Sequence, residues 1–181
     1  MNIEQPKPID FFLVAYFYQL ENLLNQEKTA LAKIKFQSEE ANTDEYFKGF
    51  VAQIISKNNS IAALTIKTIS INNNAYSIKD LEPFKITKVI LPNDLTVEQK
   101  KQLAKTKSSI YTNPDILIKI ENGENIYFKT IELKSTKVNA IPGSSIQQIK
   151  PYEWVIFIKR GKQINITTGF YINSITKKLP F

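Results

Sequence analysis

Two acidic side chains and one amine are spaced in a way that could support hydrolysis of a phosphodiester bond. Asp115 follows Pro114, and after sixteen further residues the chain reads Glu132-Leu133-Lys134. Two carboxylates can hold Mg²⁺, which prefers oxygen ligands and keeps several waters, and the backbone carbonyl of Leu133 could add a third oxygen. A bound metal ion makes water a stronger nucleophile near neutral pH. Lys134 could orient that water or neutralise charge that develops on the phosphate.

Two strand-like segments position these residues. Asp115 opens one apolar run, and Glu132 and Lys134 end a second run that extends from 126 to 134. A turn signal at 122–125 separates the two runs, so they are expected to pair as a hairpin. Side chains two residues apart share one face of a strand. Glu132 and Lys134 should therefore point the same way, with Asp115 close to Glu132.

The Glu-x-Lys triplet by itself is a weak signal. The chain has 24 Lys and Arg and 17 Asp and Glu, and a second triplet at 98–100 reads as a capped, solvated helix start. The combination is more specific, because the single Pro-Asp precedes a strand-like run and the second triplet ends a largely apolar one. Motif and context together favour metal-dependent hydrolysis over an accident of composition.

This arrangement resembles the PD-(D/E)XK nuclease superfamily. Pro114-Asp115 is similar to the first half of its motif and Glu132-Leu133-Lys134 to the second, and the resemblance covers residues 108–160. The polar stretch at 135–148 looks like that of type II restriction endonucleases. The resemblance implies Mg²⁺-dependent cleavage of double-stranded DNA by a homodimer, with 5′-phosphate and 3′-hydroxyl ends. It also implies a companion DNA methyltransferase that protects the host's own sites.

Many members of this superfamily add an acidic residue from a helix that precedes the motif. The candidates in this chain are Glu39, Glu40 and Glu45, of which Glu45 is favoured. The local sequence does not single out any of the three.

The segment that follows the triplet offers side chains suited to DNA contact. Asn and Gln can pair with adenine and Lys with guanine, while Ser hydroxyls and helix N-terminal amides can hold a phosphate. A polar loop before an ordinary capped helix would have the same composition. The predicted DNA-binding residues are Ser135, Lys137, Asn139, Ser144, Ser145, Gln147 and Gln148.

Composition narrows the possible chemistry. The 181 residues include no Cys and no His, which excludes disulfides, zinc-thiolate sites, His-ligated metals and catalysis by His. The net charge of +7 suits a polyanionic partner, although a basic protein with solvated lysines would show the same value. The apolar run at 11–18 is too short to span a bilayer and has no features of a signal peptide. We therefore expect a core helix there, a cytoplasmic protein and no membrane partner.

The expected elements indicate an α/β fold. Helices precede a cluster of strands, which predicts a single domain over 1–181 with a central mixed β-sheet flanked by helices, an α/β/α, restriction-endonuclease-like arrangement. Residues 1–60 should be mainly helical and 61–181 should form the sheet-bearing catalytic core. Apolar periodicity predicts helices at 9–36, 44–57, 95–106 and 146–149, and strands at 61–71, 88–91, 115–134 (the hairpin), 154–158 and 163–172.

Three functions remain open on this basis. A type II restriction endonuclease would cut plasmid DNA into discrete fragments. A structure-specific repair or recombination nuclease would prefer branched substrates. A non-catalytic nucleic-acid-binding protein would bind without Mg²⁺ and give no product.

Overall fold

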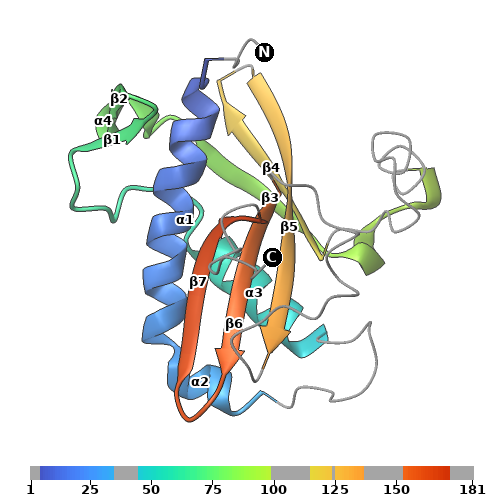
Figure 1. The fold of residues 1–181 in the computed structure, drawn as a ribbon. Coiled ribbons are helices and arrows are strands. Elements are labelled where there is room, and N and C mark those ends of the chain that lie inside the picture. The colour runs from blue at the N-terminus through green and yellow to red at the C-terminus, as the bar shows by residue number, and fades with distance from the viewer. Residues whose placement is uncertain (1–4, 35–44, 99–114, 124, 137–152, 172–181) are drawn as a thin grey trace, which may run out of the picture.

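The computed structural model describes residues 5–34, 45–98, 115–123, 125–136 and 153–171 (Figure 1). The helices in these ranges are α1 (Pro8–Gln26), α2 (Lys28–Ala32), α3 (Glu45–Lys57), α4 (Ile78–Leu81) and a short 3₁₀ helix at Pro92–Asp94. The strands are β1 (Thr68–Ile71), β2 (Asn74–Ser77), β3 (Lys85–Ile90), β4 (Ile116–Asn122), β5 (Asn125–Thr136), β6 (Trp154–Arg160) and β7 (Ile164–Phe170).

Strands β3 to β7 form one mixed sheet in the order β3-β4-β5-β6-β7. The pair β5 and β6 is parallel, and the other three pairs are antiparallel. β4 and β5 form the expected hairpin, which turns at Gly123 with a φ of 59°, a conformation that glycine adopts without strain. The prediction of an α/β protein with a central mixed sheet is therefore confirmed.

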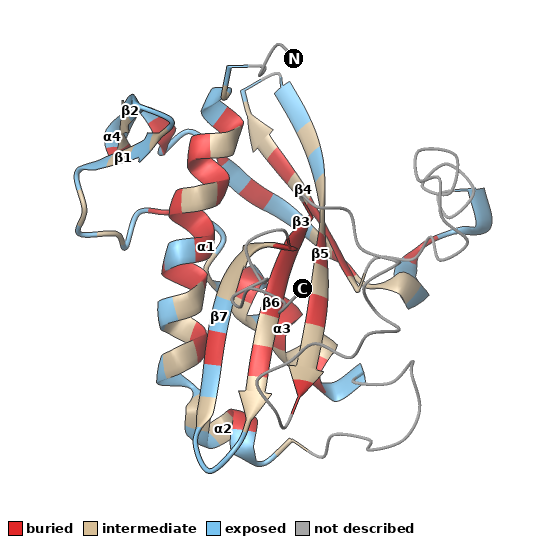
Figure 2. Ribbon diagram, viewed as in Figure 1, coloured by how far each residue is buried: buried red, intermediate tan, exposed pale blue. Residues whose placement is uncertain are grey.

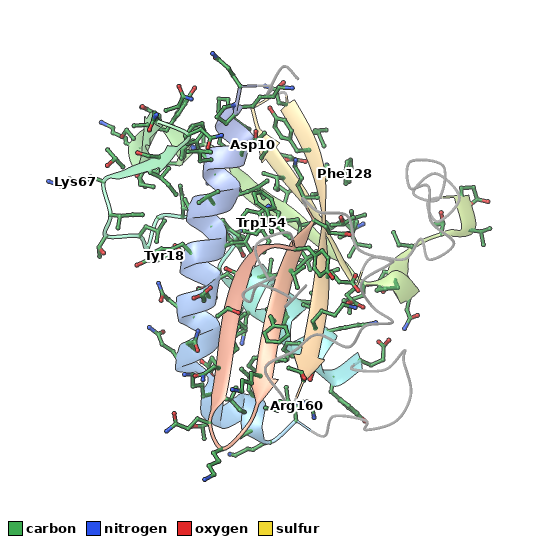
Figure 3. The ribbon with its side chains drawn as sticks, in the orientation of Figure 1. Asp10, Tyr18, Lys67, Phe128, Trp154 and Arg160 are labelled. Carbon is green, nitrogen blue, oxygen red and sulfur yellow. The ribbon has the colours of Figure 1, made fainter. Side chains whose placement is uncertain are left out.

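One face of the sheet packs against α1 and α3, and α3 lies behind β5 and β6 in Figure 1. Figure 2 shows the buried positions concentrated on α1 and on the strands. Trp154, labelled in Figure 3, stacks on Phe17 of α1 with ring centroids 4.1 Å apart and planes 6° apart. This aromatic contact ties α1 to the first residue of β6, beside the strand that carries the candidate site.

The opposite face of the sheet carries the polar positions of β5. Burial on β5 alternates, so that Ile131 and Leu133 face the helices and Glu132 and Lys134 face the other way. No helix among the described residues forms a layer over that second face. The two-sided α/β/α arrangement therefore stays a prediction.

The expected helix at 9–36 is in fact two helices. α1 ends at Gln26, and Glu27 has φ −90° and ψ 19°, which ends the regular helix although its N–H still bonds to the carbonyls of Leu23 and Leu24. α2 then begins at Lys28 and buries Leu31 in the core. The run of apolar residues continued through this break, which is why periodicity alone did not reveal it. The helix predicted at 44–57 matches α3 closely.

Three predictions for the middle of the chain need correction. The strand expected at 61–71 is reduced to β1, which pairs with β2 in a separate two-stranded ribbon and does not join the main sheet. The turn between them has positive φ at Asn72 (48°) and Asn73 (65°), as a tight two-residue hairpin requires. β3 begins three residues before the strand expected at 88–91. Of the helix expected at 95–106, Leu95 and Thr96 are not helical and Val97 and Glu98 are, so the helix begins two residues later than expected; residues 99–106 lie outside the described ranges.

α1 also covers one edge of the sheet. β7 is an edge strand, and its outward N–H groups meet side chains of α1. Glu21 Oε2 accepts the N–H of Thr168 at 2.6 Å, and Asn25 Oδ1 accepts the N–H of Ile166 at 3.3 Å. Asn25 Nδ2 in turn donates to the carbonyl of Ile166 at 2.9 Å. These bonds occupy backbone groups that could otherwise pair with a strand of another chain.

We expect Asn25→Ala to lower the free energy of unfolding by about 1–3 kcal/mol, because both polar backbone groups of Ile166 lose their side-chain partner. Urea denaturation measures the change. Asn22→Ala, at an exposed position on the same helix, is the control and should stay within about 0.5 kcal/mol of wild type. Equal effects of the two substitutions would show that the edge contact does not contribute to stability.

Candidate active site

The hairpin brings the predicted acidic residues together. Ile116 pairs with Ile131 across β4 and β5, so Asp115, directly before β4, lies opposite Glu132. Asp115 Oδ2 accepts the backbone N–H of Leu133 at 2.8 Å, which fixes the carboxylate against β5. The side chains of Asp115 and Glu132 are each 18% exposed, so the two carboxylates are close, mostly buried and still open to water.

Lys134 lies beside Glu132 on the same face of β5. Its Nζ donates to Glu132 Oε1 at 2.8 Å, and its side chain is 15% exposed. The predicted convergence of two carboxylates and one amine is therefore present in the structure. The role of the Leu133 carbonyl as a third metal ligand stays a prediction.

α3 contributes a second amine that the sequence did not indicate. Lys48 Nζ lies 2.9 Å from Asp115 Oδ1 and 3.8 Å from Glu45 Oε1. Glu45, the favoured third acidic residue, is thus near the site but is half exposed and is linked to Asp115 through Lys48. The signal that could have identified Lys48 is its position one helical turn after Glu45. That spacing is too common to be specific.

The surroundings of Glu132, including the charge of Asp115, change its proton affinity. Burial raises the pKa of Glu132, and the negative charge of Asp115 raises it further, while Lys134 and its hydrogen bond act in the opposite direction. Glu121 provides a comparison, because it too pairs with a Lys two residues away on its own strand. The hydrogen bond from Lys119 lowers the pKa of the more exposed Glu121. Burial and a second carboxylate thus distinguish Glu132 from an ordinary surface ion pair.

Lys48 remains positively charged in this environment. Burial alone lowers the pKa of Lys48, but the charge of Asp115 and the hydrogen bond to it outweigh burial and raise the pKa above its ordinary value. Glu45 and Glu132 add to this effect. Two ammonium groups therefore lie among three carboxylates.

Asp115 and Glu132 supply oxygen ligands of the kind that Mg²⁺ prefers. The described residues contain no group of three or more acidic side chains placed to hold a metal ion. Mg²⁺ is commonly held by one or two carboxylates and keeps several waters, so Asp115 and Glu132 would be sufficient protein ligands. Their proximity and the raised pKa of Glu132 are typical of carboxylates that a cation would stabilise. The side chains at this site are therefore suited to Mg²⁺, and Asp115 and Glu132 are the residues that would hold it.

The predicted DNA-binding residues lie mostly outside the described ranges. This applies to Lys137, Asn139, Ser144, Ser145, Gln147 and Gln148. Ser135 is described. Successive residues of a strand point to opposite faces, so Ser135 points toward the helix-covered face of β5 and Lys134 points away from it. The hydroxyl of Ser135 is buried without a hydrogen-bond partner. A contact between Ser135 and DNA has no support from this orientation.

The raised pKa of Glu132 has a consequence for stability. A carboxyl that binds its proton more tightly in the folded state favours folding most below its ordinary pKa of 4.5. That contribution is lost as the pH rises through the raised pKa. We expect Glu132→Gln to make the metal-free protein more stable than wild type at pH 8, with a gain that shrinks toward pH 4.5. Thermal unfolding in a chelator across this pH range measures the gain. A gain that grows as the pH falls would contradict the assignment.

Comparison of the chain with protein-family models, curated proteins and solved structures gave no match. Within the described ranges, no helix is both long enough and apolar enough to cross a membrane. Most of the apolar run at 11–18 is buried in the core on α1, whereas Tyr18 is exposed. The geometry of the site therefore carries the functional argument.

Proposed function

We propose that the protein is a Mg²⁺-dependent endonuclease that hydrolyses phosphodiester bonds of double-stranded DNA, of the type II restriction kind. The observation that supports this function best is the convergence of Asp115, Glu132 and Lys134 at one end of the β4–β5 hairpin. The resemblance of these residues to the PD-(D/E)XK motif extends the proposal to the superfamily and to its restriction-endonuclease-like fold.

Each side chain would have a separate task. Asp115 and Glu132 would hold Mg²⁺, which when bound supplies Lewis-acid chemistry at the phosphate. Asp115 is preorganised for this task, because the N–H of Leu133 holds one of its oxygens. Lys134 would orient the attacking water and neutralise negative charge that develops on the phosphate in the transition state. Its ion pair with Glu132 keeps the ammonium group at the reacting centre.

The charge of the protein favours the proposed substrate. A net charge of +7 would help to neutralise DNA phosphates, and release of the counterions supplies much of the affinity for DNA. On the same proposal the protein acts in the cytoplasm as a homodimer. Each protomer would cut one strand of a short symmetric site, and a companion methyltransferase would protect the host DNA.

Incubation of plasmid and phage DNA with the purified protein, with and without Mg²⁺, tests this function. Discrete fragments that form only with Mg²⁺ would support a sequence-specific endonuclease. Cleavage limited to branched DNA would replace restriction with a structure-specific role on the same scaffold. Mg²⁺-independent binding with no product from any DNA would exclude the nuclease and leave a binding protein.

A further inference from the structure

The ion pair between Lys48 and Asp115 occupies a carboxylate that a divalent cation would need. Lys48 Nζ lies 2.9 Å from Asp115 Oδ1, while Oδ2 accepts the N–H of Leu133 at 2.8 Å. Both oxygens of Asp115 thus have partners within the protein. A cation bound to Oδ1 at about 2.0–2.6 Å would lie within about 5.5 Å of the ammonium group. Two positive charges at that distance in a mostly buried site repel strongly.

Glu45 provides a second position for the same ammonium group. Its Oε1 lies 3.8 Å from Lys48 Nζ, and the two residues are one turn apart on α3. The side chain of Glu45 is 51% exposed, whereas that of Asp115 is 18% exposed. Because the Lys side chain is a flexible four-carbon stem, rotation about its bonds would carry Nζ from Asp115 to Glu45 without any change in the helix.

We propose that Lys48 is an internal counter-ion of Asp115 that competes with the divalent cation and transfers to Glu45 when the cation binds. This inference rests on the proposed metal site at Asp115 and Glu132. In the absence of metal, Lys48 offsets the repulsion between the two neighbouring carboxylates. Lys48 therefore sets how tightly the site holds a cation, and Glu45 is a positioning residue for Lys48 and not a metal ligand.

Calcium binding to the purified full-length protein without DNA tests the competition. We expect Lys48→Met to bind Ca²⁺ about tenfold more tightly than wild type in isothermal titration calorimetry, because the competing charge is gone. The Ca²⁺-dependent rise in melting temperature should increase accordingly. Lys48→Gln, which keeps polar atoms but no charge, should behave in the same way. Wild-type or weaker Ca²⁺ affinity in the folded Lys48 variants would overturn the proposal.

Lys119→Met is the matched control. Lys119 forms an ion pair with Glu121 on β4, in the same sheet as the candidate site, but it has no contact with Asp115 or Glu132 among the described interactions. Its loss should leave Ca²⁺ affinity unchanged. An equal gain in Lys119→Met would mean that loss of any positive charge strengthens cation binding, and would overturn the specific role of Lys48.

A double-mutant cycle tests the transfer to Glu45. Glu45→Gln should weaken Ca²⁺ binding several-fold when Lys48 is present, because the displaced ammonium loses its second partner. In the Lys48→Met background the same substitution should change the affinity by less than about twofold. Equal losses in both backgrounds would identify Glu45 as a direct ligand, and no loss in either would show that Lys48 does not transfer to it. Both results would overturn the transfer.

The calorimetric readout separates this inference from the proposed function. If wild type cleaves DNA with Mg²⁺ but the Lys48 variants bind Ca²⁺ as wild type does, the nuclease stands and the counter-ion role fails. If Lys48→Met binds Ca²⁺ more tightly while wild type cleaves no DNA, the counter-ion role stands and the nuclease fails.

Discussion

Replacing Glu132 with alanine is expected to slow the cleavage of plasmid DNA by at least about a hundredfold, the usual effect of losing a preorganised electrostatic group. Glu132 is one of the two carboxylates proposed to hold Mg²⁺, and it also fixes Lys134 through a 2.8 Å hydrogen bond. A single substitution would therefore remove a metal ligand and release the amine. Single-turnover cleavage rates in Mg²⁺ measure the loss.

Glu121→Ala is the matched control for this experiment. Glu121 also pairs with a Lys two residues away on its own strand, but it lies at the hairpin end of β4 with its side chain 35% exposed. The Glu121→Ala substitution should leave the cleavage rate within about twofold of wild type, as expected for the loss of a surface ion pair. Full activity in Glu132→Ala would rule out the catalytic assignment, whatever the control shows.

The parts of the site that could be predicted from sequence are those set by local structure. A two-residue strand period places Glu132 and Lys134 on one face, and a short hairpin loop fixes the register that aligns Asp115 with Glu132. Both relationships depend on segments that are adjacent in the sequence. The apolar runs and the turn signal were sufficient to derive them.

Lys48 could not be found in the same way. Its contact with Asp115 joins α3 to the residue directly before β4 across 67 positions of the chain, and depends on how the helix packs against the sheet. Nothing in the local pattern of α3 distinguishes Lys48 from a solvated Lys on an amphipathic helix. The same limit explains the ribbon of β1 and β2, because an alternating pattern predicts a strand but does not say which strand it pairs with.

Lys134→Met is expected to slow cleavage by at least about a hundredfold while DNA binding in Ca²⁺ persists. The substitution keeps most of the apolar stem and removes the charge that would stabilise the transition state. Glu132 and Asp115 remain to hold the cation, so the variant should separate chemistry from binding, whereas Glu132→Ala should impair both. Cleavage rates in Mg²⁺ and filter binding of DNA in Ca²⁺ measure the two effects.

Lys119→Met controls for the loss of one positive charge from the same sheet, and should retain both activities because its partner Glu121 lies outside the site. Suppose instead that Lys134→Met lost DNA binding and cleavage in equal proportion. Lys134 would then act as a phosphate anchor in the ground state, because an interaction made equally with substrate and transition state changes binding without changing the chemical step. Retained binding with lost cleavage would place the ammonium group at the reacting phosphate, and the ion pair with Glu132 would hold it there.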